Sequence, residues 1–206
     1  MRISAPVTLG ELYLARLLAE FASLHPALEL DIVLTDQPLG LVETGIDIAI
    51  VVGRLADSSH VARKLAVMRC VLVAAPKYLD RQTLPARIDD LAAFEFIRSN
   101  PSAQGDVLNF SGPDGRHSIR AQGRLLVNNG VALRELLLAG HGLAVMPLAW
   151  VHKDLAAQRL QTVLADYAPD ALEVHALYPS ARFVPTKLRA IVNFLQEQLP
   201  KLPGMV

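Results

Sequence analysis

The sequence has little of what marks a secreted, membrane-bound or nucleic-acid-binding chain. Its single cysteine, Cys70, cannot form an internal disulfide and suits a reducing cytoplasm. Lys and Arg together number 20, as do Asp and Glu, so no net charge points to nucleic acid or an anionic membrane as a direct partner. No apolar run approaches the roughly 20 residues needed to cross a bilayer. Glu11 and Arg16 interrupt the segment where a signal peptide would need its apolar core. We therefore expect a soluble, cytoplasmic protein with no membrane partner.

The motifs of common catalytic and cofactor sites are also missing. There is no Gly-x-Ser-x-Gly, no P-loop and no Gly-x-Gly-x-x-Gly. The six histidines form no i,i+4 pair and have no nearby cysteine, so we expect no metal, no cofactor and no enzymatic activity. His141 lies between two glycines, where it could cap a helix or lie on the surface, or could contact a ligand.

The 206 residues instead show the pattern of a globular α/β chain. Hydrophobic residues make up 52% of the sequence, and strand-like segments alternate with amphipathic helical ones. This alternation predicts mostly parallel sheets with helices on both faces. The strongest signals are for strands at 2–5, 46–52, 67–74 and 172–178, helices at 9–24 and 185–199, and a hairpin at 107–121 around Gly112-Pro113-Asp114-Gly115.

The stretch LLVNNGVALRELLLAGHGLAVMP, residues 125–147, predicts a strand, a turn, a helix and a second strand. A strand that ends at Val127 and a helix that starts near Gly130 place Asn129 as the N-cap. The segment after strand 2–5 repeats this arrangement, with Thr8 in the cap position. Helix N-termini beyond strand ends can bind a ligand, and two of them suggest two lobes with a cleft between. The alternative is that both caps only start helices.

Six segments, in order, resemble the effector-binding domain of LysR-type transcriptional regulators, which has the type 2 periplasmic-binding-protein fold. They are RISAPVTLGELYLARLLAEFASLHPALELDIVLTD (2–36), LVETGIDIAIVVGRLADSSHVARKL (41–65), CVLVAAPKYL (70–79), GPDG (112–115), NNGVALRELLLAGHGLAVMP (128–147) and LYPSARFVPTKLRAIVNFL (177–195). The resemblance covers nearly the whole chain. It implies two Rossmann-like subdomains with a ligand cleft between them, joined by two crossing strands.

The resemblance also implies the domain bounds and the partners. Residues 1–73 and 176–206 would form subdomain I, and 74–175 subdomain II. An N-terminal winged helix-turn-helix and its linker helix would be missing from this chain, so DNA would bind only through that missing domain. The family pairs two regulatory domains antiparallel, subdomain I against subdomain II, which implies a homodimer here and a tetramer in the full-length protein.

Carried over by position, the effector site would contain residues from both subdomains. They are Ala5, Pro6, Val7, Thr8, Gly53, Arg54, Asn128, Asn129, Gly130 and Gly142. Similar proteins often have Arg where this chain has Val51, which removes one counter-charge for an anionic effector. Arg54 could replace that charge or could simply be solvated.

We therefore predict a domain that senses a small-molecule effector, which could be a carboxylate, and passes lobe closure to DNA-binding domains. An alternative is a solute-binding protein of a transport system, against which the missing signal peptide argues. An enzyme on this fold ranks third, because no nucleophile–base pair supports it. The isolated chain is expected to show no sequence-specific DNA binding.

Overall fold

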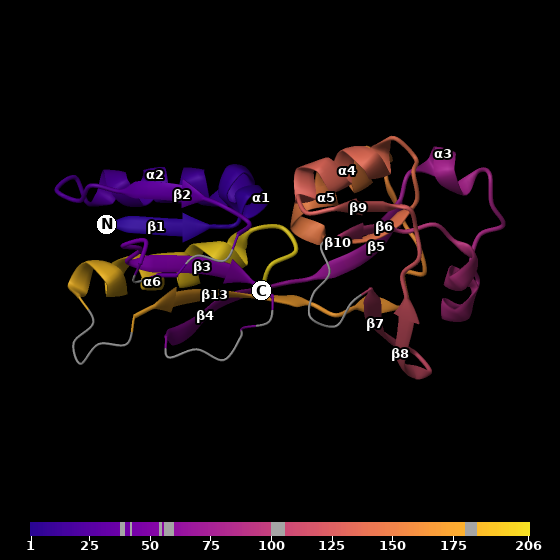
Figure 1. The fold of residues 1–206 in the computed structure, drawn as a ribbon. Helices are drawn as coiled ribbons and strands as arrows, with labels where there is room; N and C mark the ends of the chain where they lie inside the picture. The colour runs from indigo at the N-terminus through magenta and orange to yellow at the C-terminus, as the bar shows by residue number, and fades with distance from the viewer. Residues whose placement is uncertain (38–39, 42, 54, 56–59, 100–105, 180–184) are drawn as a thin grey trace. The chain divides into compact units, whose positions relative to one another are not determined.

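The computed structural model describes residues 1–37, 40–41, 43–53, 55, 60–99, 106–179 and 185–206 (Figure 1). The chain divides into two units, which are described separately below. Unit 1 consists of Met1–Met68 and Leu172–Val206, and unit 2 of Arg69–Ala171. The chain therefore passes from one unit to the other twice. The subdomain bounds expected from the sequence, 1–73 with 176–206 and 74–175, stay a prediction.

Unit 1 is built on a five-stranded sheet of order β2-β1-β3-β13-β4. Strand β1 lies parallel to β2 and to β3, whereas β13 runs antiparallel to β3 and to β4. The elements are β1 (Arg2–Ala5), α1 (Val7–Leu9), the π-helical segment η1 (Gly10–Leu14), α2 (Ala15–Leu24), β2 (Asp31–Leu34), β3 (Ile48–Val52), β4 (Val61–Met68), β13 (Leu172–Tyr178), α6 (Thr186–Gln198) and η3 (Leu199–Lys201).

Both faces of the unit 1 sheet are covered, as β3 shows. Ile48 and Ile50 are almost fully buried, and Ala49, which points to the other face, is buried with Leu41 and Ile46. The helices α2 and α6 adjoin each other, since the ring centroids of Phe21 and Phe194 lie 5.3 Å apart. A strand buried on both faces explains the unbroken apolar run at 48–52.

Unit 2 contains shorter sheets of order β10-β5-β11, β12-β7-β8 and β6-β9. A parallel bridge between Phe96 and Leu143 links the start of β6 to the start of β10. The elements are β5 (Cys70–Ala74), α3 (Pro76–Leu79), the 3-10 helix η2 (Ile88–Ala93), β6 (Ile97–Ser99), β7 (Val107–Gly112), β8 (Gly115–Arg120), β9 (Leu125–Val127), α4 (Gly130–Leu138), β10 (Leu143–Pro147), α5 (Leu148–Ala156), β11 (Gln161–Thr162) and β12 (Ala168–Pro169).

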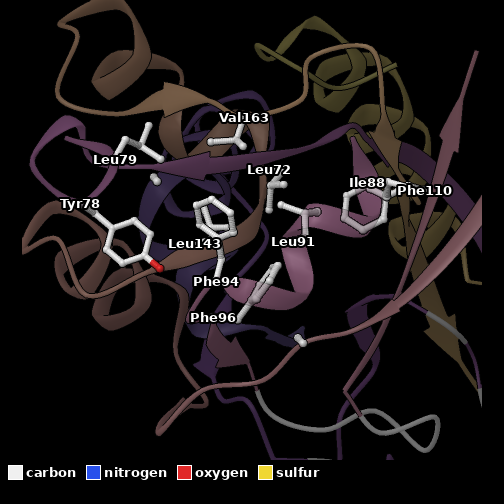
Figure 2. Close-up of a cluster of buried hydrophobic side chains, with 12 residues drawn as sticks. Leu72, Tyr78, Leu79, Ile88, Leu91, Phe94, Phe96, Phe110, Leu143 and Val163 are labelled. Carbon is white, nitrogen blue, oxygen red and sulfur yellow. The ribbon is translucent and has the colours of Figure 1, made fainter. Parts of the chain in front are cut away.

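Alternation along β5 separates two buried clusters in unit 2. Leu72 and Ala74 join an aromatic-rich cluster that includes Phe94 and Phe96 (Figure 2). Val73 points to the opposite face and joins a cluster with Leu133 and Leu137 of α4 and with Ala144 and Met146 of β10. Helix α4 is therefore fixed by packing on one face of the sheet.

The expectation of mostly parallel sheets is wrong. Among the described residues, the named parallel pairs are β1 with β2, β1 with β3 and β6 with β9, and the remaining named pairs are antiparallel. The antiparallel pairs of the unit 1 sheet arise because β13 returns from unit 2 and lies between β3 and β4, whereas those of unit 2 join β5 to β10 and β11, and β7 to β8 and β12. The order of strands and helices along the sequence does not reveal that β13 pairs with β3 and β4.

The predictions of individual strands and turns are confirmed for strand 2–5 and the hairpin, but one strand prediction is wrong. In the hairpin, Gly112 lies opposite Gly115, and Gly115 has φ +121°. The single strand expected at 67–74 is wrong, because β4 ends at Met68 in the unit 1 sheet and β5 begins at Cys70 in unit 2. Within the described residues, no helix combines the length and apolar composition that a membrane span requires.

Candidate functional site

The start of α4 carries the cap that the sequence predicts. Asn129 has extended backbone angles, and its side-chain Oδ1 accepts hydrogen bonds from the N–H groups of Val131 and Ala132, both at 3.0 Å. The Leu133 N–H donates to the Asn129 carbonyl at 3.0 Å. The prediction that Asn129 caps its helix and that Gly130 begins it is confirmed. Because Oδ1 accepts from the helix, the amide nitrogen of Asn129 remains as a separate hydrogen-bond donor.

The start of α1 is organised differently, and the expectation that Thr8 caps it is wrong. Pro6 is the N-cap residue and makes no side-chain cap bond, while Thr8 lies within the helix and is 3% exposed. The Val7 N–H donates instead to Oδ1 of Asp36 at 3.1 Å. The helix begins two residues earlier than expected, because Pro6 supplies the turn and a residue from beyond β2 supplies the acceptor.

Strand pairing explains how Asp36 reaches this helix. Strands β1 and β2 are parallel with Arg2 opposite Asp31 and Ala5 opposite Leu34, and the Thr35 N–H extends the ladder to the Ala5 carbonyl. The same register continued by two residues brings Asp36 beside Val7. A carboxylate at a helix start also interacts favourably with the helix dipole.

Within unit 1, the structure brings the predicted residues to one edge of the sheet. Ala5–Thr8 follow the carboxyl end of β1, and Gly53 follows the carboxyl end of β3, the parallel neighbour of β1. Gly53 has φ +98°, and its N–H donates to the Glu173 carbonyl at 2.8 Å. Arg54 lies outside the described residues.

Val51, where similar proteins often have arginine, lies opposite His175 of β13 and packs against the cluster that contains Leu41. His175 is 8% exposed, and its Nε2 lies 3.6 Å from Oε2 of Glu173. Glu173 in turn pairs with Lys64, so a polar group adjoins the apolar position 51.

Within unit 2, the predicted residues separate into two places. Asn128–Gly130 follow the carboxyl end of β9, whereas Gly142 precedes the amino end of β10. Because β9 is parallel to β6 and the Phe96–Leu143 bridge is parallel too, Gly142 lies at the opposite edge from Asn128.

Gly142 has a structural reason to be glycine. Its φ is +148°, and a Cβ there would lie 2.5 Å from the Glu95 carbonyl oxygen. The neighbouring Leu143 N–H donates to that same oxygen at 2.9 Å. His141 is exposed, and its backbone N–H donates to the Leu136 carbonyl at 3.2 Å in the turn that ends α4, in agreement with a capping or surface position.

Sequence reasoning missed two polar residues at these edges. One is Asp36, whose role depends on the β1–β2 register. The other is Ser99, which ends β6 directly opposite Val127 and so adjoins Asn128. Ser99 could be found only from the position of β6, which spans Ile97–Ser99 and pairs with β9.

A buried carboxylate of α5, Asp154, holds α4 through an ion pair with Arg134. The Asp154 side chain is 1% exposed. Its two oxygens accept hydrogen bonds from Nε and Nη2 of Arg134, at 2.6 and 2.7 Å. Arg159 adds an Nε bond at 2.9 Å. Burial opposes the charged form of Asp154, but the hydrogen bonds from the two arginines outweigh it, so its pKa is lowered below the ordinary value.

Comparison with known proteins decides the family. A family model described as the LysR substrate binding domain matches residues 1–200. The chain belongs to the LysR substrate-binding domain family. The expected resemblance, the α/β fold class and the absence of an enzymatic role for this domain agree with that membership. No group of three or more potential metal ligands occurs in the described part of the chain.

Individual relatives of this LysR domain support the assignment. The chain is 32% identical over 203 residues to the HTH-type transcriptional regulator PtxR of Pseudomonas aeruginosa, covering 98% of this chain and 65% of that protein. It is 30% identical over 199 residues to the HTH-type transcriptional activator AaeR of Escherichia coli K12, covering 96% of this chain and 64% of that protein. The chain thus spans slightly less than two thirds of the length of these relatives.

A solved structure supports the fold. The regulatory domain of CrgA, a LysR-type transcriptional regulator from Neisseria meningitidis, matches with a TM-score of 0.83 and 26% identity, covering 97% of this chain and 98% of that one. The type 2 periplasmic-binding-protein-like architecture of the LysR domain is therefore shown.

Proposed function

We propose that this LysR domain senses a small-molecule effector on behalf of a DNA-binding transcriptional regulator. The observation that carries the proposal is the family match over residues 1–200, combined with the polar helix start at Asn129. Regulation of transcription, and DNA binding through an N-terminal winged helix-turn-helix, are proposed for the whole protein. The named relatives described above are regulators, which favours this function over a transport solute-binding protein.

The proposed effector site comprises Ala5–Thr8 and Gly53–Arg54 from unit 1 and Asn128–Gly130 from unit 2. To these we add Ser99, which adjoins Asn128 through the strand register. Gly142 contributes indirectly, because it allows β10 to start against Glu95. The assignment of these residues rests on the family resemblance and on their positions at carboxyl ends of parallel strands, where ligands of α/β sheets bind.

The chemistry of this proposed site favours an acceptor group on the effector, such as a carboxylate. The Asn129 amide nitrogen remains as a separate donor, since its oxygen accepts from Val131 and Ala132. At the α1 start, in contrast, the Val7 N–H already donates to the carboxylate of Asp36. We therefore propose that the acceptor group of the effector binds at the α4 start rather than at the α1 start.

An effector can change the state of the protein only by binding one conformation more tightly than another. We propose that the bound state favours closure of the two subdomains and that this change reaches the DNA-binding domain. We also propose a cytoplasmic location and a homodimer through antiparallel contact of subdomains I and II, with a tetramer for the full-length protein.

A thermal-shift screen of small carboxylates, aromatic acids and their neutral amides tests the proposal. An effector present at about 100 times its Kd stabilises the folded state by about 2.7 kcal/mol. A hit that raises Tm in the acid form and not in the amide form supports the proposed chemistry. Salt-sensitive, sequence-specific DNA binding by the isolated chain would contradict the assignment of DNA binding to another domain.

A further inference from the structure

We propose that unit 2 carries a second ligand site, separate from the effector residues, that binds a small organic anion with an apolar body. The site is a pocket of about 370 Å³ lined by Ala75, Pro76, Lys77, Leu138, Gln158 and Arg159. This volume lies within the range of about 300–1,000 Å³ that is usual for small-molecule sites.

The pocket forms where three segments of unit 2 meet. These are the start of α3, the end of α4 and the turn that follows α5. The stem of Lys77 passes close to Gly140, where an added Cβ would lie 2.8 Å from Lys77 Cγ and Cε. This contact fixes the course of the Lys77 chain, and the described residues offer its ammonium group no ion-pair partner.

Arg159 supplies a second cation with a fixed orientation. Its Nε and Nη2 bind Oδ1 of the buried Asp154 at 2.9 and 2.6 Å, while 55% of its side chain remains exposed. A guanidinium has five N–H donors, so this anchoring leaves donors for an outside acceptor. Arg134 pairs with Glu135 as well as with Asp154, so the two carboxylates balance the two arginines, and Arg159 offers an outside acceptor free N–H donors rather than an uncompensated charge.

Gln158 adds a polar residue at the same place, directly after the end of α5. Its φ is +56°, a left-handed conformation that side-chain-bearing residues rarely adopt. The turn holds it there through hydrogen bonds from the Gln158 N–H to the Leu155 carbonyl at 3.1 Å and from the Arg159 N–H to the Asp154 carbonyl at 2.9 Å. A left-handed residue directly after a helix end is a common C-terminal cap, so Gln158 contributes a polar side chain to the lining and its conformation alone does not mark a ligand site.

The lining defines the class of ligand. The ammonium group of Lys77 supplies a positive charge and Arg159 supplies free N–H donors, and a carboxylate can accept from both. Ala75, Pro76 and Leu138 supply an apolar wall for a ring or short chain. An arylalkyl carboxylate combines both features, and phenylacetate is a suitable probe.

The site is separable from the proposed effector residues. Asn129 lies at the start of α4 and Leu138 at its end, nine residues later, a distance of about 14 Å at about 1.5 Å per residue. A substitution at one end therefore tests that end alone. The competing explanation is that Lys77 only offsets the negative end of the α4 dipole.

Calorimetric titration of the 206-residue chain with phenylacetate and with neutral phenylacetamide tests the site. Phenylacetate is expected to bind, and phenylacetamide to bind at least about tenfold more weakly, because it lacks the charge that the cations recognise. Lys77→Met keeps the packed stem and removes the charge, so it should weaken phenylacetate by about tenfold. Lys153→Met, which alters an exposed lysine outside the pocket, should leave the affinity unchanged. Asn129→Ala serves to distinguish binding in this pocket from binding in the proposed effector region.

Three results would overturn the proposal. One is the absence of phenylacetate binding to the unaltered chain, and another is equal affinity for acid and amide. The third is a Lys77→Met variant with a lower Tm and the same phenylacetate Kd, which would assign Lys77 to the helix end. If Asn129→Ala instead abolishes binding, the probe occupies the effector region, and the second site is rejected while the proposed function stands.

Discussion

The helices α1 and α4 both start just beyond a strand, but their first N–H groups are satisfied in different ways. At α4, Asn129 caps the helix that it precedes, with acceptor and donors two and three residues apart. At α1, the acceptor is Asp36, 29 residues further along the chain. The first arrangement is local, whereas the second exists only when β1 and β2 pair in register.

The difference shows which helix start can offer a hydrogen-bond donor to an acceptor group of a ligand. Asn129 uses its oxygen for the helix and keeps its amide nitrogen as a separate donor, while Asp36 places a negative charge against the first turn of α1. It also shows which start depends on tertiary structure. The cap of α4 forms among neighbouring residues, whereas the acceptor for the first N–H of α1 is in place only when β1 and β2 pair.

The largest expected effect comes from the anchor that holds α4 against α5. Asp154→Ala leaves Arg134 and Arg159 without their shared carboxylate and should lower the free energy of unfolding by roughly 2–4 kcal/mol. Asp170→Ala is the matched control, because both oxygens of Asp170 accept from Nη2 of Arg116 but the side chain is 41% exposed, and it should cost less than about 1 kcal/mol. Urea denaturation of both variants measures the difference. An equal loss of unfolding free energy in the two variants would show that the buried ion pair stabilises the fold no more than the exposed one.

The same anchor gives a pH dependence with a definite sign. The pKa of Asp154 is lowered in the folded state, so its contribution to stability is complete above the unfolded pKa of about 3.9 and is lost as pH falls through the folded pKa. The difference in unfolding free energy between the unaltered chain and Asp154→Ala should be constant from about pH 5 to 8 and shrink below about pH 4. A difference that grows on acidification contradicts this assignment.

Substitution by alanine should destabilise the protein more at Gly142 of unit 2 than at Gly53 of unit 1. At Gly142 an added Cβ meets the Glu95 carbonyl, so strain and collision together should cost about 1–3 kcal/mol or more. At Gly53 no atom of the described residues lies within 4 Å of the added Cβ, so the expected cost is the strain of its φ of +98°, about 1 kcal/mol. Thermal denaturation compares the two, and a smaller loss for Gly142→Ala would refute the close approach.

The two helix starts themselves should give smaller and more local effects. Asn129→Ala and Asp36→Ala should each lower stability by about 0.5–2 kcal/mol through loss of a cap. Amide hydrogen exchange should then accelerate at Val131 and Ala132 in the first variant and at Val7 in the second. Faster exchange at Val7 in Asn129→Ala would show that the two starts are not independent.

The sequence allowed prediction of those features whose causes are local. Asn129 at a strand-to-helix turn and the Gly112–Gly115 hairpin were predicted because their turn chemistry lies within a few residues. Strand β4 was missed except for its last two residues, because its first part includes exposed Arg63 and Lys64 at the sheet edge and lacks an apolar pattern.

Features that depend on distant residues could not be predicted. The cap at Val7 comes from Asp36, the antiparallel β13 returns from unit 2, and the collision at Gly142 involves Glu95. Thr8 had the right residue type for a cap, but Pro6 starts the helix earlier and leaves Thr8 buried. In each case tertiary pairing, not local preference, sets the outcome.

Calorimetric titration of an identified effector into Asn129 variants tests most directly whether the α4 start binds it. Asn129→Asp keeps the cap oxygen but replaces the amide donor with a second carboxylate oxygen. The account predicts that Asn129→Asp weakens an anionic effector more than Asn129→Ala does, although it preserves stability better, and that Thr8→Val and Asp36→Asn have smaller effects on affinity. Equal affinity of all four variants and the unaltered chain would contradict the account and leave both helix starts with a structural role alone.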